Sequence, residues 1–283
     1  NIYLKYNCKS YLAIANKELI IAGGSLLIDK ITKTQNNLIP LDSEHFSLLR
    51  SNLSNNEVSK IFITASGGPF FKKKRINLDS VKPIDAIKHP KWKMGKKISV
   101  DSASMMNKLL EAIEAQKLFS IPQNKIEIVI HPESLVHAAI EYKNGLTKFL
   151  YHKTNMIIPL ANAILEENFD IDNFLSLKDK KEDGISLNSL NFFKVDKKRY
   201  PIFKLKDRIN EHNSTPIIIN AANEILVDQF LKKKIPFNSF YHYISKVLND
   251  RNYKKFAVKK PKSIREILQI DRWARYTVIK KIN

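Results

Sequence analysis

The sequence predicts an α/β protein that combines a sheet, an antiparallel hairpin layer and a C-terminal helical domain. Apolar runs typical of strands alternate with helix-like segments over the first two-thirds of the chain. An Asn-Gly pair separates two further strand-like runs, and the last third has helical periodicity. At 283 residues the chain is long enough for two domains with a substantial core.

The strands of the predicted sheet are short apolar runs. One run contains Ile14, and the others lie at 37–41, 60–65 and 125–130. Because these runs are apolar almost throughout, they indicate buried strands.

Five segments have the periodicity of amphipathic helices, with apolar residues three and four positions apart. Ser214 and Thr215 place capping residues ahead of Pro216 at a first-turn position, which is typical of a helix start. The segments lie at 45–53, 104–119, 214–232, 237–248 and 263–279.

A β-hairpin is the clearest local structure that the sequence predicts. Strand-like residues at 135–142 and 146–151 flank Asn144 and Gly145. Because Asn-Gly suits both central positions of a type I′ turn, we expect that turn here.

The composition is that of a globular protein, with 43% hydrophobic and 27% charged residues. Apolar stretches are interrupted well before the ~20 residues that a spanning helix needs, so we expect no membrane segment. The single cysteine, Cys8, excludes an intramolecular disulfide and a Cys-based zinc site, which suits the cytosol.

The net charge of +20 fits either nucleic acid or anionic, phosphorylated small molecules. Nucleic-acid surfaces are rich in Arg and in basic stretches with interleaved aromatics. Here eight of the 48 basic residues are Arg, and the lysines are scattered over the whole chain. We therefore expect no nucleic-acid partner.

Two acidic residues follow the predicted strand at 37–41. In an extended segment the two-residue spacing of Asp42 and Glu44 points both carboxylates to the same side. Strand ends are where open α/β sheets bind ligands, and carboxylate oxygens suit Mg²⁺ or Mn²⁺. An ordinary acidic loop that starts a helix would have the same pattern.

A second polar cluster occupies 101–111, which we interpret as a loop entering a helix. On that helix Asn107, Lys108 and Glu111 share one face, because they are four and three positions apart. The alternative is a solvated helix face with a Lys-Glu pair worth at most ~0.5 kcal/mol.

Two loops have the composition of ligand-binding segments. Ser66-Gly67-Gly68-Pro69 follows a strand, where glycines let backbone N–H groups converge on a phosphate; a plain turn is the alternative. His89 and Trp92 lie in a polar loop that is either a lid over a ligand or an anchor to the core. Neither loop is a dinucleotide-binding fingerprint.

Taken together, these segments resemble 1-deoxy-D-xylulose 5-phosphate reductoisomerase. The motifs fall in the order of that family over nearly the whole chain. They are Ala15-Asn16-Lys17-Glu18, Asp42-Ser43-Glu44-His45, Ser66 to Phe70, His89-Pro90 with Trp92, Lys97 to Glu111, His131 to His137, Arg199-Tyr200-Pro201 and Asn220 to Glu224.

The resemblance implies an NADPH-dependent enzyme of the non-mevalonate isoprenoid pathway, which converts 1-deoxy-D-xylulose 5-phosphate to 2-C-methyl-D-erythritol 4-phosphate. It implies one Mg²⁺ or Mn²⁺ on Asp42, Glu44 and Glu111. It also implies a homodimer, in a bacterial cytosol or a plastid-like organelle.

Further roles follow from the resemblance alone. Lys17, Glu44 and His137 are implied to be catalytic. The implied substrate-binding residues are Ser43, Ser66, His89, Trp92, Ser102, Asn107, Lys108 and Glu111, with the phosphate on Ser66, Ser102, Asn107 and Lys108. The implied cofactor-binding residues are Asn16, Lys17, Glu18, Met94 and Met156.

The resemblance also predicts the domain organisation. Residue 1 falls well inside the family pattern, so we expect a partial sequence that lacks most of the NADPH-binding domain. Such a chain could instead be a catalytically incomplete fragment that binds metal and phosphorylated ligand, or an interaction module. The expected divisions are a Rossmann-like remnant at 1–41, a catalytic domain at 42–168, a polar linker at 169–190 and a helical domain at 191–283.

Overall fold

The computed structural model describes most of the chain as two compact units. The sheet unit comprises residues 1–17, 29–66 and 119–194, and the helical unit comprises 18–28, 67–118 and 195–283. Each unit is therefore assembled from three separate stretches of chain. The described residues are 11–33, 38–51, 53, 57–73, 76–92, 94–165, 169–175 and 189–283.

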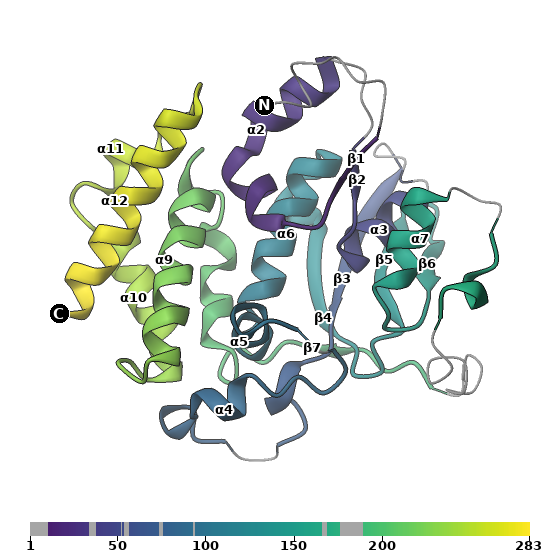
Figure 1. Cartoon of the computed structure of the whole chain (residues 1–283), viewed down its shortest axis with the longest axis horizontal. Helices are drawn as coiled ribbons and strands as arrows, with labels where there is room; N and C mark the ends of the chain where they lie inside the picture. Colours follow the sequence, from purple (N-terminus) through teal and green to yellow (C-terminus); the bar gives the residue numbers. More distant parts are fainter. Residues whose placement is uncertain are drawn as a thin grey trace. The chain divides into compact units, whose positions relative to one another are not determined.

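A five-stranded mixed sheet forms the core of the sheet unit, in the order β6-β5-β3-β4-β7 (Figure 1). β3 pairs in parallel with β4 and antiparallel with β5. Ile61 and Ile63 of this central strand are fully buried, as expected for a strand with neighbours on both sides. The strands are β3 (Val58–Ala65), β4 (Ile126–Ile130), β5 (Val136–Tyr142), β6 (Thr147–Tyr151) and β7 (Phe193–Lys194).

A second, two-stranded sheet is parallel and consists of β1 (Leu12–Ile14) and β2 (Leu38–Pro40). The helix α2 (Lys17–Lys33) connects the two strands. This βαβ arrangement is the one that Rossmann-like sheets use. Helix α2 was not predicted from the sequence, and Gly24 (φ 46°) kinks its backbone.

Helices continue the sheet unit after β2 and β6. α3 (Ser43–Arg50) packs against β5 and β6, and six of its eight residues are buried. α7 (Ile157–Ile164) follows the hairpin, and short 3₁₀ turns lie at η3 (Gln123–Lys125) and η4 (Ile171–Asn173).

The predicted hairpin is confirmed as β5 and β6, but the predicted turn type is wrong. Gly145 has a φ of 85°, whereas Asn144 is not among the described residues with positive φ. The amide of Gly145 donates to the carbonyl of Tyr142, and the amide of Tyr142 donates to the carbonyl of Leu146. The loop is thus three residues long with glycine in the left-handed position, a common alternative to type I′.

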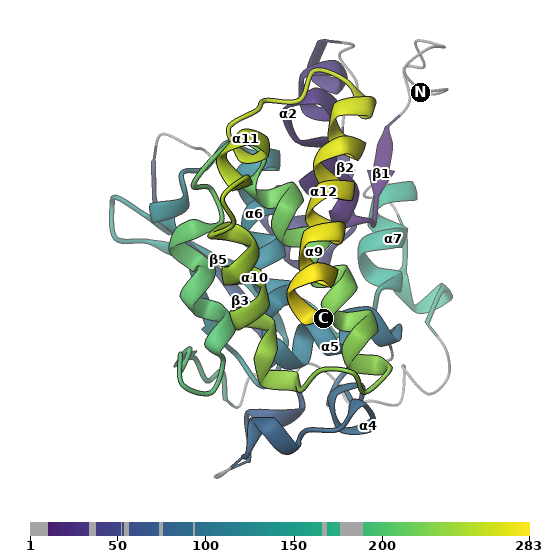
Figure 2. The same cartoon turned by 90° about the vertical axis from the view of Figure 1, so that its left-hand side faces the viewer.

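Three long helices of the helical unit pack against one another: α9 (Thr215–Leu231), α10 (Phe240–Leu248) and α12 (Ile264–Ile282) (Figure 2). All three were predicted. Aromatic rings of Phe70, Phe230, Phe237 and Phe240 fill the core with centroids 5.4–5.9 Å apart. The other elements here are η1 (Gly68–Phe70), η2 (Leu78–Ser80), α4 (Pro83–Ala86), η5 (Pro201–Arg208), η6 (Phe237–Ser239) and α11 (Tyr253–Ala257).

The helix expected at 104–119 is confirmed as α6 (Met106–Phe119), but Ser104 belongs to a separate helix that precedes it, α5 (Lys96–Ser104). Met105 lies between them with a φ of 69°. The interpretation of 101–103 as a loop is therefore wrong, because these residues form the last part of α5. The local sequence does not reveal the break, since Met105 is an apolar residue of the kind that a continuous helix places in the core. In the structure Met105 is indeed buried.

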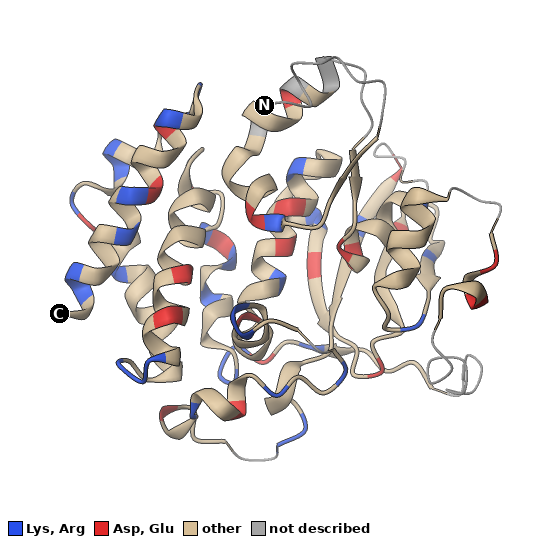
Figure 3. Cartoon of the chain, in the orientation of Figure 1, with Lys and Arg blue, Asp and Glu red and all other residues tan. Residues whose placement is uncertain are grey.

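The predicted α/β class, with a hairpin layer and C-terminal helices, is confirmed. The domain boundaries stay predictions, and residues 176–188 of the expected linker lie outside the described part of the chain. Basic and acidic residues are interspersed over the helices of both units (Figure 3). Among the described residues, no helix combines the length and apolar character that crossing a bilayer requires.

Candidate functional site

The acidic residues after β2 lie at the start of α3. Asp42 is the N-cap of that helix and Glu44 lies in its first turn, so the expectation of an extended segment carrying both is wrong. The helix N-terminus favours both carboxylates through its partial positive charge. Glu44 is 7% exposed, so this part of the chain is not an ordinary acidic surface loop.

Two donors hold these carboxylates within the sheet unit. The ammonium of Lys17, at the start of α2, forms an ion pair with Oδ2 of Asp42. The hydroxyl of Ser43 donates to Oε2 of Glu44 at 2.7 Å. Lys17 and Ser43 are each 6% exposed, so the acids are paired in a nearly dry environment, where unpaired charge is costly.

The polar face of α6 forms a second buried cluster, in the helical unit. The Asn107 amide donates to Oε1 of Glu111, and Lys108 Nζ lies 2.8 Å from Oε2 of the same carboxylate. The predicted shared face is confirmed. The alternative of a solvated face is wrong, because Glu111 is 1% exposed and its two neighbours are 8% exposed.

The glycine loop after β3 has an unusual backbone. Gly67 and Gly68 have φ values of 81° and 62°, which glycine adopts without strain. A Cβ on Gly68 would lie 3.0 Å from the carbonyl oxygen of Ser102 and 3.1 Å from Cα of Ala103. The loop that follows Ser66 therefore contacts the last turn of α5 backbone to backbone, where Ser102 lies.

Helix α5 also carries a polar network around Asp101, to which the sequence assigned no role. Asp101 is 1% exposed; its carboxylate accepts from Asn223 at 2.8 Å and pairs with Lys97 at 2.9 Å. Lys97 also pairs with Glu18. Burial raises the pKa of the Asp101 carboxyl, and the ammonium of Lys97 opposes that shift. The network joins α5 to α9.

The described residues of the predicted lid, 89–92, 94 and 95, lie outside regular elements. Nδ1 of His89 accepts from the amides of Lys91 at 3.1 Å and Trp92 at 2.8 Å. Burial, followed by the positive charge of Lys108, lowers the pKa of His89 to about 4. The side chains of Trp92 and Met94 are half-buried.

His137 lies on β5 in the sheet unit and is 3% exposed. Its ring stacks on that of His152, with centroids 3.9 Å apart and planes inclined by 12°. Burial lowers the pKa of His152, which is not among the residues predicted from the sequence. No spacing rule could have identified this partner, because the two residues meet across the hairpin.

Three of the predicted cofactor-binding residues are more accessible than the two acidic clusters, whereas Lys17 is buried in the α3 cluster. Asn16 is exposed, Glu18 is half-buried beside Lys97, and Met156 is 37% exposed at the N-cap of α7. These positions stay predictions.

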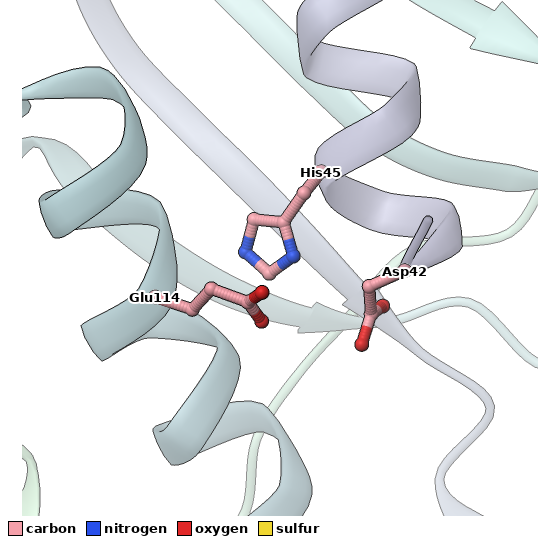
Figure 4. A group of neighbouring side chains, drawn as sticks. All are labelled: Asp42, His45 and Glu114. Carbon is pink, nitrogen blue, oxygen red and sulfur yellow. The ribbon is translucent and has the colours of Figure 1, made fainter. Parts of the chain in front are cut away.

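Two buried titratable residues were missed as candidate ligands. Figure 4 shows His45, which comes from α3 with Asp42, and Glu114, which comes from α6. His45 is 0% exposed and Glu114 is 1% exposed. Their positions beside Glu44 and one turn after Glu111 could have drawn attention to them. Among the described residues, two sets have the types of donor that could hold a metal ion: Asp42 with Glu44 and Glu111, and Asp42 with His45 and Glu114. In each set the glutamate of α6 belongs to the helical unit and the other two residues belong to the sheet unit.

The chain matches one family in two segments. Residues 38–119 match the family described as 1-deoxy-D-xylulose 5-phosphate reductoisomerase C-terminal domain. Residues 152–277 match the family described as DXP reductoisomerase C-terminal domain.

Curated relatives carry the name 1-deoxy-D-xylulose 5-phosphate reductoisomerase. The Pelagibacter ubique protein is 43% identical over 263 residues, which are 92% of this chain and 66% of that protein. The Acetivibrio thermocellus protein is 37% identical over 273 residues, which are 95% of this chain and 69% of that protein. The chain thus spans 66% and 69% of the length of these relatives.

Solved structures with the same fold include a DOX-P reductoisomerase in complex with NADPH, fosmidomycin and magnesium. It has a TM-score of 0.85 and 31% identity, over 96% of this chain and 70% of that one. The enzyme from Zymomonas mobilis in complex with NADPH has a TM-score of 0.79 and 32% identity, over 96% of this chain and 69% of that one.

Proposed function

Because the chain belongs to the 1-deoxy-D-xylulose 5-phosphate reductoisomerase family, we propose that it binds the divalent metal and the phosphorylated substrate of that NADPH-dependent reaction. The product would be 2-C-methyl-D-erythritol 4-phosphate. The observation that carries the proposal is the buried cluster on α6, where Lys108 and Glu111 are paired. Burying two charges is costly, so a paired ammonium and carboxylate on a dry helix face favours a binding role.

The proposed metal ligands are Asp42, Glu44 and Glu111. Three carboxylates provide hard oxygen donors of the kind that Mg²⁺ and Mn²⁺ prefer. Two ligands belong to the sheet unit and one to the helical unit, so the proposal requires both units to reach the same cation. When bound, the cation would stabilise the negative charge that develops on the substrate oxygens.

The proposed phosphate contacts are Lys108 as the point charge, with Ser66, Ser102 and Asn107 as hydrogen-bond donors. The close contact of the Gly68 backbone with Ser102 supports this grouping, because it brings the loop and the end of α5 together. His89 and Trp92, in a loop with Met94, would cover the substrate and exclude water.

Lys17, Ser43 and His137 are proposed to orient the substrate oxygens. Lys17 and Ser43 already hold the two acids of α3, so their donors lie beside the proposed ligands. NADPH would supply the hydride, with Asn16, Glu18 and Met156 among its contacts. The chain spans 66% of the length of the Pelagibacter ubique protein, and its cofactor contacts are part of the proposal.

A homodimer is also proposed, in a bacterial cytosol or a plastid-like organelle. β6 is at one end of the strand order, and its first three residues are exposed. Edge strands are positions at which a second chain can add to a sheet. Light scattering would test the dimer, and a monomer at micromolar concentration would contradict it.

The test of the metal and its ligands is calorimetry with Mn²⁺. Glu111→Gln should weaken Mn²⁺ binding at least about tenfold, since it removes one charged ligand. Glu224→Gln is the matched control, because Glu224 pairs with Arg275 elsewhere in the helical unit. Unchanged binding by Glu111→Gln would show that the metal assignment is wrong.

The activity is tested separately by NADPH oxidation in the presence of 1-deoxy-D-xylulose 5-phosphate and Mn²⁺. Turnover that Glu111→Gln abolishes would support the complete reaction. Mn²⁺ and phosphate binding without turnover would instead support a catalytically incomplete fragment.

A further inference from the structure

The glycine loop of the proposed phosphate site is held from the C-terminal third of the chain. The hydroxyl of Tyr200 donates to the carbonyl oxygen of Gly67 at 2.7 Å. Nη1 of Arg199 donates to the carbonyls of Phe70 and Phe71 at 2.7 and 2.6 Å. Two neighbouring side chains thus bind three carbonyls of one short loop, and all these residues belong to the helical unit.

Tyr200 is built into the fold rather than placed at the surface. It is 1% exposed, its amide donates to the carbonyl of Asp196, and it directly precedes η5. Burial raises the pKa of its hydroxyl, so the phenol keeps its proton and acts as a donor. A tyrosine with its ring buried and its hydroxyl satisfied has little freedom to move.

The hydrogen bond from the Tyr200 hydroxyl to the Gly67 carbonyl fixes the orientation of the Gly67–Gly68 peptide plane. In a trans peptide the carbonyl of Gly67 and the amide of Gly68 point in opposite directions. A hydrogen bond to the carbonyl therefore also sets the direction of that amide. This matters most where both residues have positive φ, since glycines lose more conformational freedom on ordering than other residues.

The same peptide is in contact with the end of α5. Gly68 approaches the backbone of Ser102 and Ala103 so closely that a Cβ would have to displace it. Ser66 precedes this peptide in the chain. A rotation of the Gly67–Gly68 peptide would therefore disturb the backbone beside two of the proposed phosphate donors.

We propose that Tyr200, supported by Arg199, is a positioning residue for phosphate binding, because its hydroxyl fixes the Gly67–Gly68 peptide. This rests on the proposed function, in which Ser66 and Ser102 contact the phosphate. Tyr200 itself contacts the loop and takes no part in the chemistry.

The test compares Tyr200→Phe with Tyr253→Phe in the chain, using inorganic phosphate as the probe and phosphorus NMR as the readout. Both tyrosines are buried in the helical unit, but the Tyr253 hydroxyl bonds to Thr215, away from the loop. Tyr200→Phe should weaken phosphate binding about three- to tenfold, the equivalent of one lost hydrogen bond. Tyr253→Phe should leave phosphate binding unchanged.

Mn²⁺ affinity separates positioning from general damage. Tyr200→Phe should bind Mn²⁺ like the unchanged protein, because the proposed metal ligands lie elsewhere. Equal losses of phosphate and Mn²⁺ affinity would indicate a structural role and overturn the proposal. If the unchanged protein binds no phosphate, the proposed function fails instead, and this inference with it.

Hydrogen exchange gives a readout that needs no ligand. Tyr200→Phe should increase amide exchange in the segment 67–71, and Tyr253→Phe should not. Unchanged exchange in that segment would overturn the proposal even if phosphate binding had weakened.

Discussion

The acidic clusters on α3 and α6 contain similar residues but are assembled in different ways. On α6 the carboxylate of Glu111 and its partners Asn107 and Lys108 lie within one helical turn. On α3 the carboxylate of Asp42 pairs with Lys17, which is 25 residues away on another helix. The α6 cluster therefore forms whenever its helix forms, whereas the α3 cluster forms only when α2 and α3 are both in place.

Replacing the lysine of the α6 cluster should lower the free energy of unfolding more than replacing the lysine of the α3 cluster. Lys108→Met leaves the Glu111 carboxylate buried without that ammonium, and breaking a buried pair should lower the free energy of unfolding by about 3 kcal/mol. Urea denaturation without metal measures it. Lys232→Met is the control, since its pair with Asp228 has a similar distance, 2.7 Å, but is 57% and 47% exposed.

The control substitution Lys232→Met should cost less than about 0.5 kcal/mol. If Lys108→Met and Lys232→Met lowered the free energy of unfolding equally, burial would not make the Lys108–Glu111 pair more important to stability than a surface pair.

Replacing Lys17, the lysine of the α3 cluster, should lower the free energy of unfolding by a smaller amount. Lys17→Met should cost about 2 kcal/mol, because the N-terminus of α3 still stabilises the acids after the ammonium is lost. The same denaturation experiment measures it. Lys60→Met, which breaks the exposed Lys60–Glu127 pair of the sheet unit, should cost less. A larger loss for Lys17→Met than for Lys108→Met would reverse the comparison.

Ser43, the neutral donor of the α3 cluster, should contribute less to the free energy of unfolding than Lys17 does. Ser43→Ala removes the hydrogen bond to Glu44 and should cost about 1 kcal/mol. Ser80→Ala removes an exposed hydroxyl that bonds to the carbonyl of Asn77, and it should be near neutral. If thermal denaturation gives the two variants the same melting temperature, the Ser43 contact contributes nothing to stability.

The smallest predicted effect is a change in the titration of His89. Its pKa of about 4 lies below the ordinary 6.5 because of burial first and the charge of Lys108 second. The folded state thus favours the neutral ring, and the resulting stability, present above pH 6.5, is lost as the pH falls toward 4. Lys108→Met should raise the pKa only part of the way, since burial remains, and NMR titration measures it.

A His89 pKa unchanged by Lys108→Met would mean that the predicted lid and the α6 cluster are not electrostatically coupled. A pKa that returned fully to 6.5 would mean that burial contributes nothing.

Local spacing explains which elements could be predicted. Asn107, Lys108 and Glu111 share a face in any helix, and the strands flanking Asn144 and Gly145 pair in any hairpin. The exact turn was not predictable, because Asn-Gly suits more than one loop geometry. The break at Met105 was not predictable either, since its buried position between α5 and α6 is set by packing and not by a helix-breaking residue.

The sequence by itself determined the α/β class, the family, the hairpin and the polar face of α6, because all of these depend on patterns within one segment or on the order of motifs. The tertiary structure alone decided which distant groups meet: Lys17 with Asp42, Asn223 with Asp101, His152 with His137 and Tyr200 with Gly67. The physical reason is burial. Polar groups removed from water require partners, and only the packed fold determines which partners are within reach.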